Sequence, residues 1–437
     1  MIMTAHQNAQ ILQKKFESKD ATLAVIGQGY VGLPLAMEAA EVGFKVVGVD
    51  ISAARVAQAN SGSSYILDVS DEQLQGVIDK GLYKATTDYA DLADADAISI
   101  CVPTPLRKTR DPDISYIQRS LEQIKPHLKA PCLIVLESTT YPGTTEEIIR
   151  DALSETGLVQ DEDFFVAFSP ERVDPGNAHY GTHNTPKVIG GCTPTSTKLA
   201  GLLYGHFIDT VHLVGNAREA EMVKLLENTF RAVNIALVNE MMLMCDRMDI
   251  NIWSVIEAAA TKPFGFMPFY PGPGIGGHCI PLDPTYLSWK AKSFGFYNRF
   301  IELATDINGN MPRFVIQKLV RELNNQGKAL QGAKILLVGM AYKSNIDDLR
   351  ESPALDIWEL LKQWGAEISY HDPFVDQIAS LGATSQDLSA QMLSEYDAVV
   401  VTTKHKSVDH DLIAANASLV LDTRNAVTQT GDHIVKL

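Results

Sequence analysis

Short apolar runs alternate with helical patterns through the first part of the chain. Residues 22–26 (TLAVI) and 45–50 (KVVGVD) are typical of buried strands, and residues 33–43 (LPLAMEAAEVG) between them predict a helix with a proline in its first turn. Further apolar runs predict strands at 96–101, 132–136 and 164–168. Strands that alternate with helices favour a parallel sheet covered on both faces.

The middle of the chain has a different pattern. Residues 216–250 contain no glycine or proline and are apolar along more than one helical stripe, which predicts one long helix with more helices after it. A second strand–helix–strand pattern starts near residue 333 and ends at Asp372, and more strands are predicted within 396–403 and 418–423. The predicted fold class is α/β, with two Rossmann-like doubly wound parallel-sheet domains joined by a central helical domain that contains the long helix.

Composition narrows the function classes. The 437 residues are 46% hydrophobic and 21% charged, as expected for a soluble globular enzyme of two or three domains. No apolar run approaches the roughly eighteen residues of a membrane span, and residues 1–20 lack the apolar segment of a signal peptide, so we expect a cytoplasmic protein with no membrane partner. A net charge of −16 argues against nucleic-acid binding. Five scattered cysteines without metal-ligand spacing argue against a disulfide framework and against a metal site.

A glycine motif follows the first predicted strand. Gly27, Gly29 and Gly32 form G-x-G-x-x-G, in which the first glycine permits a tight turn, the second lets a pyrophosphate approach the backbone, and the third lets helix and sheet pack closely. Asp50 ends the next predicted strand, where a carboxylate holds ribose hydroxyls and repels the 2′-phosphate of NADP. The pattern therefore predicts a dinucleotide site that prefers NAD. Arg55 either reaches the adenosine end of the cofactor or is a solvated helix residue.

Further polar residues lie just after predicted strands and on the long helix. Hydroxyls in 101–106 (CVPTPL) and 137–145 (ESTTYPGTT) serve either the cofactor or ordinary turns. Lys224 and Asn228 are four residues apart and share a helix face, which suits the stabilisation of an oxyanion, although a surface lysine is the more ordinary interpretation. Glu171 is either a base or half of a salt bridge, and spacing alone favours the salt bridge.

One thiol lies in a loop with little side-chain bulk. Residues 272–284 (GPGIGGHCIPLDP) hold four glycines and three prolines around Cys279, so they form neither a helix nor a core strand. A cysteine is usually a small buried hydrophobe, but glycines leave room for a ligand beside this one. Backbone donors and cationic neighbours would favour its thiolate. We therefore interpret Cys279 as a nucleophile and the adjacent His278 as structural.

With these motifs assembled, residues 20–430 resemble the UDP-glucose/GDP-mannose dehydrogenase family. The motifs that carry the resemblance stand in the family's order: GQGYVGLPLA, CVPTP, ESTTYPGTT, SPERVDPGN, EAEMVKLLENTFRAVNIALVNE, GPGIGGHCIPLDP and GMAYKSNIDDLRESPA. The resemblance implies that two NAD oxidise the C6 hydroxymethyl group of a nucleotide sugar to a carboxylate, a precursor of surface polysaccharides. The intermediate aldehyde adds to the cysteine as a thiohemiacetal, a second oxidation gives a thioester, and water releases the acid.

The resemblance also implies roles for individual residues. The implied catalytic residues are Cys279 as nucleophile, Lys224 and Asn228 as the oxyanion-stabilising pair, Glu171 as the base that activates water, Asp283 as the residue that orders this water and Lys224, and Thr139 as a hydroxyl beside the water. The implied cofactor contacts are Gly27, Gln28, Gly29, Tyr30, Val31, Gly32, Asp50, Arg55, Pro103, Thr104, Ser138, Thr139 and Arg350. The implied substrate contacts are Glu171, Arg172, Val173, Lys224, Asn228, Tyr270, Gly272, Gly274, Gly276, Tyr342, Lys343 and Arg424.

On this basis we predict four parts of the chain. They are an N-terminal arm at 1–20, an NAD-binding Rossmann domain at 21–212, a central helical and dimerisation domain at 213–328 that carries the catalytic lysine and the cysteine loop, and a C-terminal UDP-sugar-binding Rossmann-like domain at 329–437. The long helix is too apolar around its circumference for one exposed face. We therefore predict a homodimer or a higher homo-oligomer, as the resemblance also implies.

The predicted substrate is a UDP-N-acetylhexosamine. The UDP-glucose branch has a lysine where this chain has Leu282 and an arginine shortly before the cysteine loop, whereas residues 248–298 contain no arginine. The loop resembles the branch that acts on UDP-N-acetylhexosamines, so we predict UDP-N-acetylglucosamine, with UDP-glucose and the mannosamine and galactosamine epimers as alternatives. Two other classes stay open: a one-step NAD-dependent hydroxyacid dehydrogenase, which needs no nucleophilic cysteine, and a dinucleotide-sensing module without activity.

Overall fold

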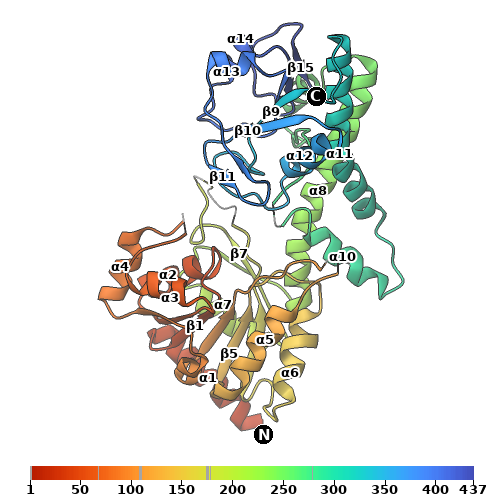
Figure 1. The fold of residues 1–437 in the computed structure, drawn as a ribbon. Coiled ribbons are helices and arrows are strands. Elements are labelled where there is room, and N and C mark those ends of the chain that lie inside the picture. Colours follow the sequence, from red (N-terminus) through yellow and green to blue (C-terminus); the bar gives the residue numbers. More distant parts are fainter. Residues whose placement is uncertain (1, 67, 108–110, 174–176, 178, 278) are drawn as a thin grey trace. The chain divides into compact units, whose positions relative to one another are not determined.

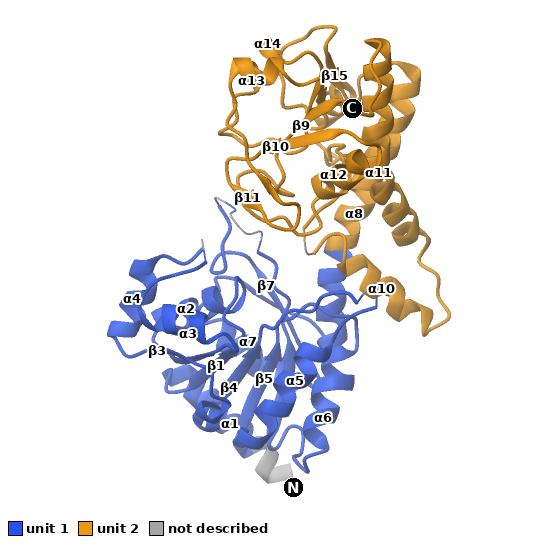
Figure 2. Ribbon diagram, viewed as in Figure 1, with its two compact units in different colours: residues 1–227 blue, residues 228–437 orange. Residues whose placement is uncertain are grey.

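A sheet of wholly or mainly parallel strands lies at the centre of each of two units into which the chain divides, residues 1–227 and 228–437 (Figure 2). The structure is a computed structural model that describes the chain apart from residues 1, 67, 108–110, 174–176, 178 and 278, and apart from the side chains of residues 2–6. We refer to the two parts as unit 1 and unit 2. Each has its own hydrophobic clusters on the two faces of its sheet.

Unit 1 is built on an eight-stranded sheet in the order β3-β2-β1-β4-β5-β6-β7-β8. Figure 1 labels its strands β1, β5 and β7. Its strands are β1 (Thr22–Ile26), β2 (Lys45–Val49), β3 (Tyr83–Thr86), β4 (Ala97–Ile100), β5 (Cys132–Leu136), β6 (Phe164–Phe168), β7 (Lys187–Gly191) and β8 (Val211–Leu213). Neighbouring strands are parallel, with Thr22 of β1 opposite Lys45 of β2, except that β6 and β7 are antiparallel. The first six strands have the order of a dinucleotide-binding Rossmann sheet.

Helices cover both faces of this sheet. They are α1 (Ile2–Ser18), α2 (Gly32–Glu41), α3 (Ala53–Asn60), α4 (Asp71–Asp79), α5 (Ser115–Ile124), α6 (Asp151–Ser154) and α7 (Pro194–Tyr204), with short helical turns η1 (Tyr89–Asp94), η2 (Lys125–His127) and the π-helical η3 (Thr145–Arg150). Leu23 and Val25 of β1 join one hydrophobic cluster, whereas Ala24 and Ile26 join another. A strand that is apolar at every position is thus buried on both faces.

The N-terminal arm predicted for residues 1–20 is largely a helix, α1. Leu12 and Phe16 lie four residues apart on it, and both side chains are fully buried in the core of unit 1. Lys15 Nζ lies 2.5 Å from the carboxylate of Asp96, which precedes β4. Two apolar residues in a polar segment therefore hold this helix against the sheet domain.

The long helix predicted at 216–250 is α8 (Ala217–Met248). It begins in unit 1 and ends in unit 2, because the boundary between the units falls between Glu227 and Asn228. The absence of glycine and proline explains why the helix runs without a break for 32 residues.

Unit 2 contains a five-stranded parallel sheet in the order β10-β9-β13-β14-β15. Its strands are β9 (Lys334–Val338), β10 (Glu367–His371), β13 (Ala398–Val401), β14 (Val420–Asp422) and β15 (Ile434–Lys436), beside an antiparallel pair, β11 (Gln377–Ile378) and β12 (Ala383–Thr384). Its other helices are α9 (Ile252–Ala260), α10 (Asp283–Lys292), α11 (Arg299–Asn325), α12 (Pro353–Gln363), α13 (Ala390–Ser394) and α14 (His410–Asn416). Ile335 and Leu337 of β9 pack with Met242 of α8 and Val315 of α11, and Leu336 packs into a cluster on the other face.

The predicted fold class is confirmed by these two sheets and the helical stretch between them along the chain. The sequence did not indicate β3, β7 and β8, and the antiparallel contact of β6 with β7 makes the first sheet mixed rather than wholly parallel. In the part of the chain that is described, no helix combines the length and the apolar composition needed to span a bilayer.

Candidate active site

The three motif glycines of unit 1 have different surroundings. Gly27 has a φ of +90°, and a Cβ there would lie 2.6 Å from the Cys101 carbonyl oxygen. A Cβ on Gly32 would lie 1.8 Å from the Gly27 carbonyl oxygen, whereas a Cβ on Gly29 would meet no atom within 4 Å. Gly27 and Gly32 are therefore required by the backbone itself, and the open space beside Gly29, before the N-terminus of α2, fits a pyrophosphate.

We expect alanine to separate these two kinds of glycine. Gly29→Ala should leave the melting temperature close to that of the wild type but weaken NAD binding by about tenfold or more, ~1.4 kcal/mol, because its methyl group enters the cofactor space. Gly32→Ala should lower the free energy of unfolding by about 3 kcal/mol or more through the clash with Gly27. Calorimetric titration with NAD and thermal melting measure the two effects, and wild-type affinity in Gly29→Ala would contradict the assignment.

Gln28 of the glycine loop, and Asp50 and Arg55 after β2, have partners within the protein. Gln28 is buried; its side chain donates to the Val25 carbonyl at 2.8 Å and accepts from Tyr83 at 2.8 Å. Asp50 accepts from the backbone N–H of Gln28 at 2.9 Å and of Ser52 at 2.8 Å. These bonds fix the Asp50 carboxylate at the end of β2, and its other lone pairs can accept from ribose hydroxyls. Arg55 lies 3.7 Å from Asp50, beside the cofactor loop rather than away from it.

Turn chemistry accounts for two of the predicted hydroxyls. Ser138 is buried and donates to the Val102 carbonyl at 2.7 Å, and Thr104 donates to the Thr139 carbonyl at 2.7 Å. Together these bonds join the loop after β4, which includes Pro103, to the loop after β5. The hydroxyl hydrogens of Ser138 and Thr104 thus hold the two loops together, and their oxygens keep acceptor capacity.

A buried carboxylate on α8 holds the loop that carries Thr139. Glu221 accepts from the backbone N–H of Gly143 at 2.6 Å, and from the backbone N–H and hydroxyl of Thr145 at 2.8 and 2.7 Å. Burial raises the pKa of Glu221 to about 7, against the effect of these hydrogen bonds. Glu221 carried no signal in the sequence pattern, although it lies one helical turn before Lys224.

Lys224 and Glu171 lie together in unit 1. Lys224 is buried, and its Nζ donates to the backbone carbonyl of Glu171, so the surface-lysine interpretation is wrong. Glu171 Oε1 accepts from the backbone N–H of Val173 at 2.6 Å, and its Oε2 lies 3.8 Å from Nζ of Lys187. Arg172 pairs instead with Glu227 at 2.5 Å.

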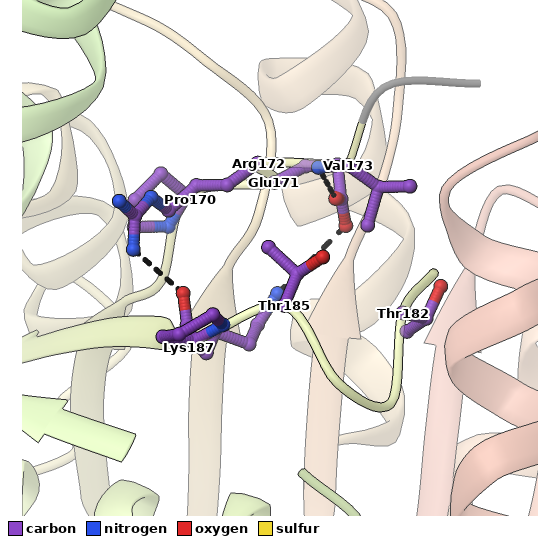
Figure 3. A pocket seen from close by; sticks show the side chains of 8 residues that line it. Pro170, Glu171, Arg172, Val173, Thr182, Thr185 and Lys187 are labelled. Atoms are coloured by element: carbon purple, nitrogen blue, oxygen red, sulfur yellow. Dashed lines mark hydrogen bonds and ion pairs between the residues drawn. The ribbon is translucent and has the colours of Figure 1, made fainter. Parts of the chain in front are cut away.

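An open hollow of about 190 Å³ lies beside these residues (Figure 3). Its lining residues are Pro170, Glu171, Arg172, Val173, Thr182, Thr185, Pro186 and Lys187. The Arg172 guanidinium donates to the Pro186 carbonyl at 2.6 Å. Figure 3 shows the Glu171 carboxylate held at the Val173 N–H. One carboxylate and two cations are thus among the groups that line this hollow.

The cysteine loop of unit 2 leads into α10. Asp283 is the first residue of this helix and is buried; its backbone N–H donates to the Cys279 carbonyl at 2.8 Å. The buried amide of Asn228 on α8 donates to the Asp283 carboxylate at 2.5 Å. The structure therefore brings Asn228, Asp283 and Cys279 together. His278 lies outside the described residues.

The glycines before Cys279 make room for neighbouring protein atoms and not, as the sequence suggested, for a ligand. A Cβ on Gly272 would lie 2.5 Å from Arg424 Nη1, and a Cβ on Gly276 would lie 2.5 Å from Tyr342 Cβ. Gly274 similarly faces Pro353 at 3.1 Å. Protein atoms, rather than a ligand, occupy the space beside these glycines. The close packing brings four predicted substrate contacts together: Gly272, Gly276, Tyr342 and Arg424.

Other contacts of unit 2 fix the same region. Tyr270 stacks on Trp253 with ring centroids 6.1 Å apart, and the Gly272 N–H donates to Asn239 at 3.0 Å. Arg424 Nε donates to the Thr402 carbonyl at 2.9 Å, and burial lowers the pKa of this guanidinium to about 10, so it stays cationic at neutral pH. Arg350 pairs with Asp348 at 2.6 Å, and its predicted contact with the cofactor stays a prediction.

The loop of Tyr342 and Lys343 is held by Asp372 and His405, which the sequence analysis did not assign. Asp372 Oδ2 accepts from the backbone N–H of Met340 at 2.6 Å, and His405 Nε2 lies 3.2 Å from it. Although burial opposes this, hydrogen bonds from His405 and backbone N–H groups hold the pKa of Asp372 below its usual value. Asp372 therefore plays the same anchoring role after β10 as Asp50 does after β2.

Among the residues that the structure describes, no group of three or more His, Cys, Asp or Glu side chains is arranged to hold a metal ion.

Three domains of one family match this chain. The UDP-glucose/GDP-mannose dehydrogenase family matches through its NAD binding domain at residues 21–208, its central domain at 218–310 and its UDP binding domain at 336–429. The glycine loop and Asp50 lie in the first match, Lys224 and Cys279 in the second, and Tyr342 in the third.

Individual relatives agree with this match. The UDP-N-acetyl-D-mannosamine dehydrogenase of Pyrococcus horikoshii is 37% identical over 93% of this chain and 96% of its own length. The UDP-N-acetyl-D-glucosamine 6-dehydrogenase of Pseudomonas aeruginosa is 36% identical over 89% of this chain and 91% of its own. A solved structure of the UDP-D-ManNAc dehydrogenase from Pyrococcus horikoshii superposes with a TM-score of 0.88 at 36% identity, covering 95% and 98% of the two chains. The chain therefore belongs to the UDP-glucose/GDP-mannose dehydrogenase family, and it is an NAD-dependent nucleotide-sugar dehydrogenase of the UDP-N-acetylhexosamine type.

Proposed function

We propose that this enzyme oxidises the C6 hydroxymethyl group of UDP-N-acetylglucosamine, in preference to its epimers, to the uronic acid with two NAD per turnover. The observation that carries the proposal is the anchoring of the cysteine loop, in which Asn228 bonds to Asp283 and Asp283 bonds to the Cys279 backbone. A thiol on a loop fixed in this way is suited to capture an aldehyde, because the backbone that carries the cysteine is held in place by hydrogen bonds.

The cofactor site fits the proposal. Gly27, Gly29 and Gly32 would hold the pyrophosphate and Asp50 the ribose hydroxyls, since the space beside Gly29 is open and the Asp50 carboxylate is fixed by two backbone N–H groups. NAD, when bound there, supplies the acceptor for the hydrides that leave C6.

The chain's own residues perform the other steps. The Cys279 thiolate forms a bond to the C6 aldehyde carbon, and Lys224 and Asn228 stabilise the oxygen that takes up the electron pair. Loss of a hydride from this thiohemiacetal leaves a thioester on Cys279. Glu171 then accepts a proton from water as the water attacks the thioester carbonyl, the C–S bond breaks, and the thiolate returns with the acid released.

The substrate preference is proposed from sequence positions near the cysteine. Leu282 replaces the lysine of the UDP-glucose branch, and residues 248–298 contain no arginine. Tyr342 and Arg424 are proposed contacts of the nucleotide sugar, and their packing on Gly276 and Gly272 supports a common role.

We expect two NADH per molecule of acid and a higher kcat/KM for UDP-N-acetylglucosamine than for UDP-glucose. Initial rates with UDP-N-acetylglucosamine, UDP-N-acetylgalactosamine, UDP-N-acetylmannosamine and UDP-glucose, with NADH counted against product, test both parts. A tenfold preference for UDP-glucose would refute the substrate class. One NADH per product would indicate a one-step dehydrogenase, and none a sensing module.

A homodimer built on α8 is also proposed. Leu226, Phe230, Leu237, Met244 and Met248 are exposed, and their spacing of four or seven residues places them on one face of the helix. An apolar stripe of this length is suited to a second copy of the same helix.

A further inference from the structure

A buried ion pair lies beside Glu171 and has no role in the proposed mechanism. Lys187 begins β7, and its Nζ lies 2.7 Å from Oε2 of Glu137, which follows β5. The exposed fractions of the two side chains are 5% and 0%. The other oxygen of Glu137 accepts from the Tyr204 hydroxyl at 2.5 Å, and Ser99 lies 3.0 Å from that hydroxyl.

The free energy of folding alone does not explain why this ion pair is buried. A buried ion pair can often be replaced by apolar residues of similar volume without loss of stability, because removing two charges from water is costly. Although burial disfavours the ammonium form, the carboxylates of Glu137 and Glu171 raise the pKa of Lys187, so it is a cation. The arrangement places one fixed positive charge between two carboxylates.

The two carboxylates are bound differently. Glu137 is within hydrogen-bond distance of Lys187, whereas Glu171 Oε2 lies 3.8 Å from the ammonium nitrogen and so interacts with it as an ion pair without a short hydrogen bond. Glu171 Oε1 is occupied by the Val173 N–H at 2.6 Å. Oε2 therefore keeps lone pairs that can accept a proton from water.

The side chains of Glu171 and Lys187 line the same hollow (Figure 3). We propose that Lys187, held in place by Glu137, is a positioning residue that keeps the Glu171 carboxylate oriented as the base for thioester hydrolysis. This inference rests on the proposed function, because it assigns a partner to the proposed base.

Titratable and charged groups from several elements surround Lys187 and Glu171. They are Glu137 after β5, Cys101 after β4, Tyr204 of α7, Lys224 of α8, whose Nζ donates to the Glu171 carbonyl, and Arg172, which pairs with Glu227. Burial raises the pKa values of the Cys101 thiol and the Tyr204 hydroxyl, so both stay neutral. Lys187 is therefore the cation whose side chain pairs with the Glu171 carboxylate among the contacts described here.

The test removes the charge of Lys187 without leaving Glu137 buried and unpaired. Lys187→Met alone would leave the Glu137 carboxylate buried and unpaired, which could unfold the domain. The variant of choice is therefore the double replacement Glu137→Gln/Lys187→Met. The matched control is Asp246→Asn/Lys318→Met, which neutralises another largely buried pair, 2.7 Å apart and far along the chain in unit 2. Asp246 also pairs with Arg321 at 3.1 Å, on the exposed side of this pair. Circular dichroism and melting establish that both are folded.

The readout is the decay of the Cys279 thioester, followed by rapid quenching and intact-protein mass spectrometry. In the Glu137→Gln/Lys187→Met variant we expect the thioester to decay roughly tenfold more slowly, because the Glu171 carboxylate loses the ion pair that orients it. The KM for UDP-N-acetylglucosamine and the amplitude of the first NADH burst should stay within about twofold of wild type. The control variant should keep the wild-type rate of decay.

Failure of this inference is distinguishable from failure of the proposed function. An unchanged rate of thioester decay in the folded double variant, or an equal slowing in the control, overturns the role of Lys187 while the enzyme still makes acid. A wild-type chain that forms no NADH with any of the four UDP-sugars, or Glu171→Gln that hydrolyses the thioester at the wild-type rate, overturns the proposed mechanism and this inference with it.

Discussion

Cys279→Ser should stop production of the uronic acid while leaving the KM for the UDP-sugar little changed. Serine is nearly isosteric with cysteine, so the loop and its bonds to Asp283 should persist. A serine hydroxyl is hardly ionised near neutral pH, whereas a thiol has a pKa of about 8.5 and is a far better nucleophile. We expect acid formation to fall by about 10³-fold or more, in the range of losses seen when a nucleophile is removed.

Cys245 provides the matched control for this loss. It is the other cysteine of unit 2 and lies buried on α8 among apolar side chains. Cys245→Ala should keep near wild-type turnover, with at most a modest loss of stability. Acid and NADH are measured together by chromatography and absorbance. A Cys279→Ser enzyme that makes acid at close to the wild-type rate would show that the thiol only fills space.

Glu171→Gln should have the opposite signature, an accumulated covalent intermediate. The glutamine oxygen can still accept from the Val173 N–H, so the side chain should keep its position, but the amide cannot take a proton from water. The thiol is intact, so the two oxidations should proceed and the thioester should decay about 10²-fold more slowly or worse. Intact-protein mass spectrometry after mixing with substrate and NAD should detect the sugar-nucleotide adduct.

Glu146→Gln controls for the loss of a carboxylate. The exposed fraction of the Glu146 side chain is 17%, against 16% for Glu171, and it pairs with Arg218 at 2.7 Å rather than with groups of the proposed site. This variant should show no adduct beyond the wild-type level. Rapid acid release by Glu171→Gln would assign the base to another residue.

The sequence was informative where one segment determines its own structure. The apolar runs of β1 and β2 and the uninterrupted stretch of α8 need few partners to be recognised, and all three are confirmed. The glycine loop was recognisable because strand, turn and helix follow one another within about a dozen residues.

Features that depend on distant partners were missed. Lys187 is a polar residue at a strand end, and only the sheet brings it to Glu137, fifty residues earlier, and to Glu171. Gly272 and Gly276 were expected to leave room for a ligand, but their neighbours Arg424 and Tyr342 come from loops far along the chain. No pattern in the segment itself carries such contacts.

The glycine motif has a consequence for how such chains change over evolutionary time. Gly27 and Gly32 are constrained by carbonyl oxygens of the chain itself, whereas Gly29 borders open space. Selection for a foldable protein acts on the first and third glycines, and selection for a working cofactor site acts on the second. A descendant that lost its enzymatic role but kept its fold would be free to replace Gly29 while retaining Gly27 and Gly32, so the state of that one position distinguishes an active lineage from a repurposed one.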